Sequence, residues 1–294
     1  MNIGRKIEKL YSMMQPCSLC PRQCGALRNE GQKGLCKTAD KIFVASSGVH
    51  MGEEPPISGT RGSGTIFFSN CAMNCVFCQN YPISQYGNGR EISLDDLVAS
   101  ILKLQDRGVH NINFVTPTHY SAHAAEAVFK AKSKGLEIPV LWNTSGYENY
   151  ETLRLLEGTV DIYLPDIKYA DDVLSFKYSG VKNYVETNRR ALIEMKRQVG
   201  DLQTDAQGIA RKGIIIRHMV LPGNAENTKQ CLDFIAGSLS AQTRVSLMSQ
   251  YHKAYKSETF AELSKGLSYE EYDEAVSYLE SLGFTNGWIQ ELEL

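Results

Sequence analysis

The chain has 294 residues, of which 43% are hydrophobic and 22% are charged, and these are the proportions of an ordinary globular protein. Its formal net charge of −2 gives no overall attraction to nucleic acid or to an anionic membrane, so we expect neither as a partner. No apolar run approaches the roughly 18 residues that span a bilayer, and the first residues lack the apolar stretch of a secretory signal. We therefore expect a cytoplasmic protein, in which eight cysteines indicate metal or redox chemistry rather than disulfides.

The chain is predicted to begin with a short helix over residues 1–16, followed by a cysteine-rich segment. The spacing C-x2-C-x3-C-x11-C, with Gly and Pro for tight turns, makes a four-thiolate site plausible. Zinc or a second Fe–S cluster would fit such a site, and four reduced thiols without a metal are the alternative. The four residues are Cys17, Cys20, Cys24 and Cys36.

Residues 42–64 are rich in Gly, Ser and Pro, and we expect them to form a loop. Within this loop, Glu53 and Glu54 are expected to face solvent, and the alternative is that they lie near the active site. Arg61–Thr65 resembles a phosphate-binding loop only superficially, because it precedes a strand and has no Gly-Lys-Ser/Thr ending; it is predicted to be a turn. These features predict an N-terminal cysteine-rich extension over residues 1–62 and a second domain over residues 63–294.

A second group of three cysteines directly follows a predicted strand at residues 65–69. Cys71, Cys75 and Cys78 have the spacing C-x3-C-x2-C. Three thiolates on so short a loop can hold three irons of a 4Fe–4S cube, and the fourth iron stays open to a ligand from outside the protein. The alternatives are buried free cysteines and a structural zinc site with a distant fourth ligand.

Strands and helices alternate along the rest of the chain, which predicts an α/β fold with a parallel sheet and right-handed crossovers. Six strands are too few to close an eight-stranded barrel, so we predict a partial (β/α)6 TIM-like barrel. The expected strands are 65–69, 112–115, 139–142, 160–164, 214–217 and 245–248. The expected helices cover about 94–108, 122–134, 153–156, 184–199, 228–236 and 269–282.

Polar residues follow each predicted strand, and in parallel barrels the carboxyl ends of the strands carry the active site. The isolated Cys231, Met219 and Met248 are expected to be core residues. His119 is a candidate substrate contact. The other candidate site residues are Thr116, Thr118, Asn143, Thr144, Asp166, Lys168, Arg217 and His252.

The three-cysteine loop, with Phe77 before its last cysteine, resembles the motif of the radical S-adenosylmethionine (SAM) superfamily, and the chain resembles its pyruvate formate-lyase-activating branch as far as about Tyr251. The resemblance implies that SAM chelates the open iron and that the reduced cluster cleaves it to a 5′-deoxyadenosyl radical. It also implies an electron donor such as flavodoxin or ferredoxin.

The resemblance extends to the residues expected to hold SAM. It places Phe77 at the adenine, His252 near SAM, and Arg217 at the SAM carboxylate. Residues 143–146 and 166–168 resemble turns that handle the methionyl carboxylate and the ribose, partly through a monovalent cation. Residues 116–118, Thr-Pro-Thr, stand where relatives carry the Gly-Gly-Glu that holds the SAM amino group, so the carboxylate of that motif is missing.

These observations leave three functions to compare. The first is hydrogen abstraction from a backbone glycine of a glycyl-radical protein. The second is radical SAM chemistry on a small metabolite or a peptide, which the departure at residues 116–118 and the cysteine-rich N-terminus support. The third is a non-catalytic zinc or Fe–S protein, for example a nucleic-acid binder. The acidic charge balance and the lack of a basic aromatic patch count against binding of nucleic acid.

Overall fold

The computed structural model describes residues 1–292 and has one central sheet with the strand order β10-β9-β8-β6-β5-β4-β2-β1-β3. The strands from β2 to β10 in this order are parallel, and β1 and β3 extend the sheet in antiparallel fashion. The short β7 pairs only with β8. The strands are β1 (Ile42–His50), β2 (Ser63–Phe68), β3 (Arg90–Ile92), β4 (Ile112–Val115), β5 (Val140–Thr144), β6 (Ile162–Pro165), β7 (Gln203–Thr204), β8 (Ala210–Met219), β9 (Arg244–Met248) and β10 (Trp288–Ile289).

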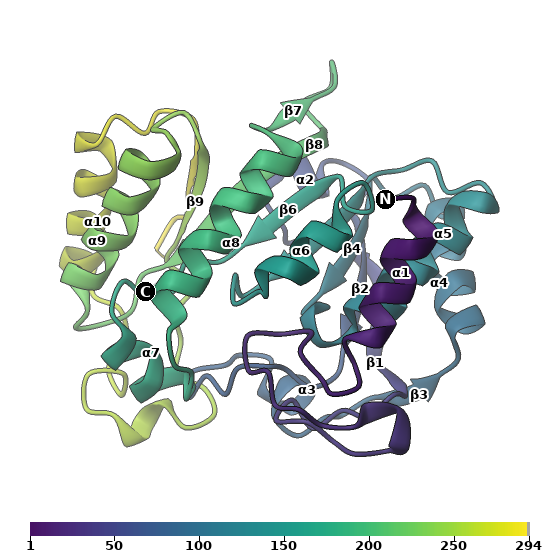
Figure 1. The fold of residues 1–294 in the computed structure, drawn as a ribbon. Helices are drawn as coiled ribbons and strands as arrows, with labels where there is room; N and C mark the ends of the chain where they lie inside the picture. Colours follow the sequence, from purple (N-terminus) through teal and green to yellow (C-terminus); the bar gives the residue numbers. More distant parts are fainter. Residues whose placement is uncertain (293–294) are drawn as a thin grey trace.

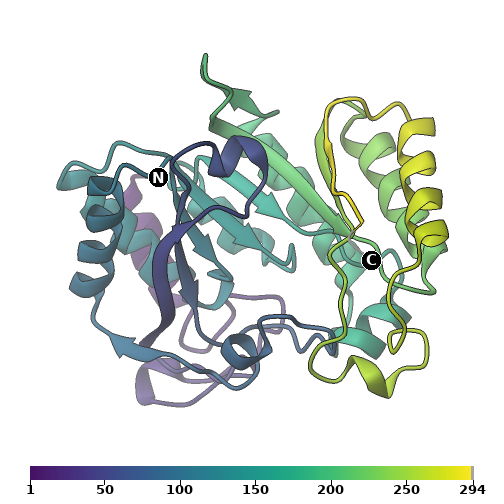
Figure 2. The same cartoon turned by 180° about the vertical axis from the view of Figure 1, so that it is seen from behind.

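Helices cover one face of this sheet, whereas the other face is open apart from the short α2 (Figures 1 and 2). Because each crossover between parallel strands carries a helix on the same side, the sheet curves into an incomplete barrel, as predicted. The helices are α1 (Ile3–Ser12), α2 (Pro55–Ser58), α3 (Tyr81–Ser84), α4 (Leu94–Asp106), α5 (Ser121–Ser133), α6 (Tyr150–Leu156), α7 (Asp172–Ser179), α8 (Tyr184–Val199), α9 (Ala225–Phe234) and α10 (Tyr269–Ser281). Among the described residues, no helix combines the length and apolarity needed to cross a bilayer.

The six predicted parallel strands are confirmed as β2, β4, β5, β6, β8 and β9, but the expected loop over residues 42–64 is wrong in its first half. There β1 runs antiparallel to β2, with Val44 opposite Phe68 and His50 opposite Ser63. Only the start of β1 is buried, and its Ser and Gly residues lie where the strand is exposed. A strand with so few buried positions carries little apolar periodicity, so composition alone suggested a loop.

The division at residue 62 remains a prediction. It is notable that β1, inside the predicted extension, pairs with β2 of the predicted barrel domain. The last two residues of that domain, 293 and 294, lie outside the described part of the chain.

The helix α2 closes the amino-terminal end of the open barrel face. Its Ile57 is fully buried against the inward side chains of β5, β6 and β8, including Leu141, Leu164 and Ile215. This apolar contact fixes the connection between β1 and β2, so the acidic residues just before α2 are carried inward.

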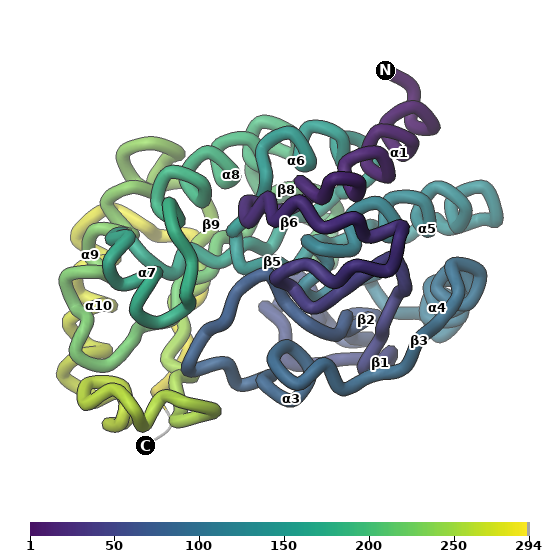
Figure 3. The backbone as a smooth tube through the Cα atoms, turned by 60° about the horizontal axis from the view of Figure 1, so that its bottom comes forward, coloured from purple at the N-terminus to yellow at the C-terminus, as the bar shows by residue number. Residues whose placement is uncertain are grey.

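The cysteine-rich N-terminal segment lies at the opposite end, next to the carboxyl ends of the parallel strands. Asn149 Nδ2 donates to Ser18 O at 2.6 Å, and Thr152 Oγ1 donates to Leu19 O at 2.8 Å, so the segment is bound to the start of α6. In Figure 3 this purple segment crosses the end of the sheet between α6 and α3.

Candidate functional site

The three-cysteine loop follows β2 and is held in place by backbone hydrogen bonds from separate elements. Asn70 enters it with a left-handed backbone (φ 69°), which asparagine tolerates better than most residues. Asn74 N donates to Ser179 O at 3.0 Å, and Val76 N donates to Tyr178 O at 2.8 Å, both at the end of α7. The loop is therefore fixed by tertiary contacts before any ligand binds.

Each sulfur of the loop lies beside a polar group that can donate a hydrogen bond to a thiolate. Ser179 Oγ donates to Cys75 Sγ at 2.9 Å, Met73 N lies 3.4 Å from Cys71 Sγ, and Ser84 Oγ lies 3.0 Å from Cys78 Sγ. Burial raises the pKa of the Cys71 thiol well above its usual range and that of Cys75 to about 11, although the nearby Lys168 ammonium acts to lower both. Such thiols stay protonated at neutral pH unless a metal displaces the proton.

Three thiolates on one loop could bind a single ion or three corners of a cube. Within residues 1–292, no group of three or more His, Cys, Asp or Glu side chains is arranged to hold one metal ion. A 4Fe–4S cube makes a different demand, because each of three thiolates binds its own iron atom at a separate corner.

A cavity of about 420 Å³ lies directly beneath the loop, at the carboxyl ends of the strands. Its volume falls within the roughly 300–1,000 Å³ typical of small-molecule sites. Predicted site residues from the loop and from four strands meet here: Cys71, Cys75, Phe77, Cys78, Thr116, Asn143, Thr144, Asp166, Lys168 and Arg217. Met219 and Met248 also line the cavity, although they were expected only in the core, whereas Cys231 is buried as predicted.

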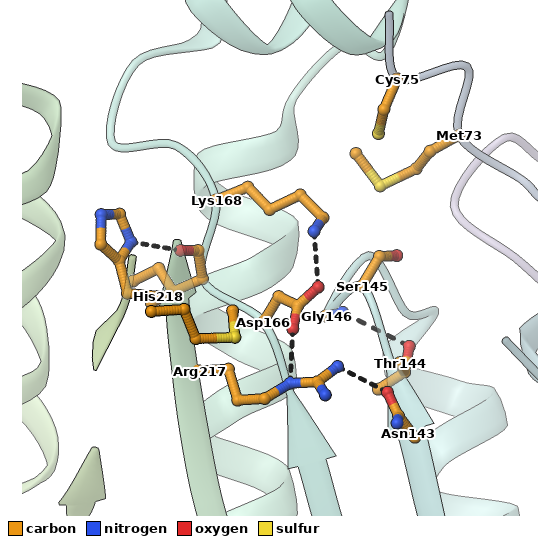
Figure 4. A network of polar contacts seen from close by, with 12 residues as sticks. Met73, Cys75, Asn143, Thr144, Ser145, Gly146, Asp166, Lys168, Arg217 and His218 are labelled. Carbon is orange, nitrogen blue, oxygen red and sulfur yellow. Dashed lines mark hydrogen bonds and ion pairs between the residues drawn. The ribbon is translucent and has the colours of Figure 1, made fainter. Parts of the chain in front are cut away.

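A network of ion pairs forms the wall of the cavity opposite the cysteines (Figure 4). Arg217 Nε donates to Asp166 Oδ1 at 2.9 Å, and Lys168 Nζ donates to Asp166 Oδ2 at 2.5 Å. Arg217 also donates from Nη2 to Asn143 Oδ1 at 2.6 Å. Burial by itself would raise the pKa of Asp166, but Lys168 and Arg217 together hold it below its ordinary value. Asp166 is thus a carboxylate with both oxygens paired.

The turn after β5 shows why glycine is needed at position 146. Gly146 has φ of 70°, and a Cβ there would lie 2.3 Å from Asp166 O. Any side chain would push this turn away from β6. The glycine therefore lets Thr144 and Asp166 approach each other at the rim.

Glu53 is part of this site, and the expectation that it faces solvent is wrong. It lines the cavity, accepts from Asn113 Nδ2 at 2.8 Å and from Asn143 Nδ2 at 3.2 Å, and lies 3.4 Å from Arg217 Nη1. Glu54 is also buried, and burial raises its pKa. The apolar Pro-Pro-Ile sequence after these acids was the available signal, because it packs into the barrel and carries them inward.

Three other candidates lie elsewhere. Thr118 is buried behind the cavity wall, and the imidazole of His119 is buried against Ser69 O at 2.9 Å, with burial lowering its pKa to about 3. His119 therefore does not face the cavity. His252 is exposed and does not line it either, whereas the adjacent Tyr251 is buried near Phe77.

Glu148 is a buried carboxyl group that the sequence analysis missed. Its Oε1 accepts from Thr144 Oγ1 at 2.5 Å, Thr118 Oγ1 at 2.7 Å and Trp142 Nε1 at 3.2 Å. Its Oε2 is buried and has no hydrogen-bond partner among residues 1–292. Burial raises the pKa of this carboxyl more than the three hydrogen bonds lower it. Glu148 thus fixes the rim threonines after β4 and β5 from behind.

Substitution of Glu148 separates its charge from its hydrogen bonds. Glu148→Gln keeps the oxygen that accepts three hydrogen bonds, so we expect little loss of stability, whereas Glu148→Leu strands three buried donors and costs about 3 kcal/mol. Urea unfolding measures both. The raised pKa favours the protonated carboxyl in the folded state, so the free energy of unfolding of the parent falls as the pH rises. The amide in Glu148→Gln does not ionise, so the stability of this variant relative to the parent should increase with pH. Equal losses for both variants would contradict this role.

Comparison with known proteins decides the family. A sequence model of the radical SAM superfamily matches residues 65–235, which is more than half of the chain. The chain belongs to the radical SAM superfamily. Membership implies a 4Fe–4S cluster, SAM, and cleavage of SAM by radical chemistry. The matched region contains the three-cysteine loop and the strands that carry the ion-pair network.

Two relatives show how far the similarity extends. A protein of Methanocaldococcus jannaschii, MJ0674, is 30% identical over 284 residues, which cover 94% of this chain and 77% of the relative. The pyruvate formate-lyase-activating enzyme of Clostridium pasteurianum is 23% identical over 178 residues, covering 58% of this chain and 68% of that enzyme. The similarity to the first relative therefore extends beyond residues 65–235.

Two solved structures share the fold at low sequence identity. Streptococcus suis SuiB bound to its precursor peptide SuiA has a TM-score of 0.53 at 13% identity, covering 76% of this chain and 47% of that chain. The hydrogenase maturase HydG of Carboxydothermus hydrogenoformans has a TM-score of 0.54 at 13% identity, covering 79% and 54%. The chain thus spans about half the length of these proteins, and the likeness confirms the partial barrel.

Proposed function

We propose that this radical SAM enzyme takes a hydrogen atom from a glycine of a partner protein. The observation that carries the proposal is one cavity in which the three loop cysteines face the Asp166–Arg217–Lys168 network. When bound, the cluster and SAM supply the one-electron chemistry that generates the 5′-deoxyadenosyl radical. The chain binds and orients these groups and excludes water around them.

The residues present fit both groups. Cys71, Cys75 and Cys78 would hold the cluster, since each sulfur has a polar neighbour that stabilises a thiolate. SAM carries a carboxylate, an ammonium and a sulfonium, and the cavity offers charges of both signs. Arg217 and Lys168 suit the carboxylate.

The remaining lining residues complete the proposed SAM site. Glu53 provides the carboxylate that residues 116–118 lack, and Phe77 provides an aromatic surface for adenine. Thr116, Asn143 and Thr144 offer polar groups for the ribose. A monovalent cation here would compete with Arg217 and Lys168 for Asp166.

A protein substrate is supported by the open barrel and by two similar proteins. One is named a pyruvate formate-lyase-activating enzyme, and the other was solved with a precursor peptide bound. A substrate that covers the open face would exclude water from the radical. This part of the proposal goes beyond family membership.

The test is anaerobic incubation of the reconstituted, reduced enzyme with SAM and candidate glycyl-radical proteins. The expected result is a glycyl doublet in the EPR spectrum. Formation of 5′-deoxyadenosine without a doublet for any candidate would contradict the glycyl assignment while leaving SAM cleavage intact.

A second candidate function is radical chemistry on a small metabolite or a short peptide with charged groups. It is favoured by the lining of the cavity, where Glu53 and Asp166 lie together with Arg217 and Lys168. A backbone glycine has no need of such a charged environment. Transfer of deuterium from a labelled small molecule into 5′-deoxyadenosine would support this function over the first.

We also propose that the four N-terminal cysteines bind a metal, either zinc or a second Fe–S cluster, which would draw together sulfurs that do not form an ion site in this structure. The guanidinium of Arg28 is fully buried beside Cys17, and its hydrogen bonds go to the backbone oxygens of Ala39 and His119. No carboxylate within residues 1–292 pairs with it. Metal-bound thiolates would supply the missing negative charge.

The packing around these cysteines also favours a ligand set. A Cβ at Gly34 would lie 2.8 Å from Cys24 Sγ and 3.6 Å from Cys36 Sγ, so glycine lets the chain close over the sulfurs. Thr38 Oγ1 lies 3.0 Å from Cys36 Sγ. These contacts place a polar neighbour beside one sulfur and bring two of them together.

Replacing Cys36 by serine tests this metal site. We expect Cys36→Ser to lose one zinc or about four irons per chain, depending on the metal, while the iron of the three-cysteine loop remains. Elemental analysis of the anaerobically purified protein measures both. Unchanged zinc and iron contents would show that these thiols carry no metal.

A further inference from the structure

A second hollow lies on the outer side of the three-cysteine loop. It has a volume of about 690 Å³ and runs between the N-terminal segment, the loop after β5, and the stretch from α7 to α8. We call it the outer groove; the residues that matter here are Arg22, Leu35, Phe176, Gly180, Lys182 and Arg190. In Figure 1 the purple N-terminal segment and α7 lie at the same end of the sheet.

The wall of the outer groove touches the loop that would hold the cluster. Arg22 Nε donates to Ala72 O at 2.9 Å, and Ala72 directly follows Cys71. Arg22 Nη1 donates to Gly180 O at 2.6 Å. Ser179, next to Gly180, donates to Cys75 Sγ at 2.9 Å. Arg22 therefore contacts the residue next to Cys71, and Gly180 is next to the residue that contacts Cys75.

On the barrel side of the three-cysteine loop, the proposed SAM and substrate sites occupy the approach to the cluster. In the proposed function, SAM and the substrate would fill the cavity on the barrel side and cover its open face. Electron transfer slows steeply with distance, so a protein donor must approach the loop closely. The outer groove provides this approach without displacing either ligand.

The rim of the outer groove has the character of a protein-docking surface. Leu35 and Phe176 are each 58% exposed, and exposed apolar side chains that line the same hollow can mark a protein-interaction site. Lys182 and Arg190 are exposed cations beside them, whereas Glu151 is the exposed carboxylate of the lining. Arg22 adds a third positive charge. Apolar contact with a cationic rim suits an acidic partner.

We propose that the outer groove is the docking site for an acidic one-electron carrier protein, which passes its electron across the Arg22 wall to the cluster. The carrier is oxidised by one electron and the cluster is reduced by one, with no proton or group transferred. This inference rests on the proposed function, because it assigns a surface to the reduction step. It names a carrier of the flavodoxin or ferredoxin kind by its charge and redox chemistry.

Charge reversal on the rim tests the proposal. The double variant Lys182→Glu/Arg190→Glu changes two exposed side chains outside the proposed catalytic machinery. Reduction of the reconstituted full-length protein is followed by stopped-flow absorbance with reduced flavodoxin, and separately with dithionite. We expect the flavodoxin rate constant to fall at least about tenfold at low salt, since steering contributes roughly 10- to 1,000-fold, and its salt dependence to weaken.

The matched control is Lys132→Glu/Lys134→Glu, which makes the same charge change at the exposed end of α5. We expect this control, and dithionite reduction of both variants, to match the parent. An unchanged flavodoxin rate in the groove variant would overturn the proposal, as would an equal loss in the control. Loss of glycyl-radical formation with dithionite would instead assign the groove to the substrate protein and also overturn it. Failure of the parent to make 5′-deoxyadenosine with dithionite would reject the proposed function itself.

Discussion

Replacement of Cys75 by serine is expected to abolish 5′-deoxyadenosine formation and to remove about four irons per chain. Serine oxygen is a poor ligand for Fe–S clusters, which select soft thiolate sulfur. Loss of a partner behind a ligand already costs 10- to 100-fold in metal affinity, so loss of the ligand should exceed roughly 100-fold. Iron analysis and chromatographic detection of 5′-deoxyadenosine measure the two effects.

The control is Cys231→Ala, which removes the buried thiol of α9 outside both cysteine groups. This variant leaves a small cavity in the core but should retain the iron and the activity of the parent. Retention of the cluster in Cys75→Ser would show that the three-cysteine loop is not its ligand set. Loss of iron in both variants would indicate a general effect on folding.

Replacement of Arg217 by methionine should cause the second large effect. It leaves the carboxylates of Asp166 and Glu53 without their shared cation, and Asp166 keeps only Lys168. Removing one partner of a buried ion pair costs about 3–5 kcal/mol, so the midpoint of urea unfolding should fall markedly. SAM binding, measured by isothermal titration calorimetry, should weaken in parallel if Arg217 holds the SAM carboxylate.

Arg211 on the same strand offers a matched control. It pairs with Asp205 at 2.7 Å on the surface, and solvent screens such pairs. Arg211→Met should therefore leave both stability and SAM binding close to those of the parent. If Arg217→Met had the same midpoint of urea unfolding as Arg211→Met, the ion-pair network would contribute nothing to stability. A loss of stability without a loss of SAM affinity would contradict the proposed carboxylate contact.

The sequence predicted the parts of the molecule whose chemistry depends on local spacing. Six of the seven parallel strands have strong apolar runs, and the three cysteines occur within eight residues, so short-range pattern was sufficient for these. Asp166, Lys168 and Arg217 were found because each follows or ends a strand. The structure brings these three to one wall of the cavity, as the barrel rule requires.

The residues that were missed reach the site through tertiary contacts. Glu53 enters the barrel because Ile57, four residues later, packs under the sheet. Glu148 lies one turn beyond β5 and becomes important only when β4 brings Thr118 beside Thr144. Arg22 meets Ala72 across a separation of fifty residues. No periodicity or spacing within one segment reports such encounters.

The antiparallel β1 and the helix α2 lie outside the parallel series, yet they deliver Glu53 to the base of the cavity. The carboxylate proposed for the SAM ammonium is consequently encoded before the first parallel strand, apart from the loop that would hold the cluster. Exchange of residues 42–62 for another sequence would therefore change the proposed SAM site while all three cysteine ligands stayed in the chain.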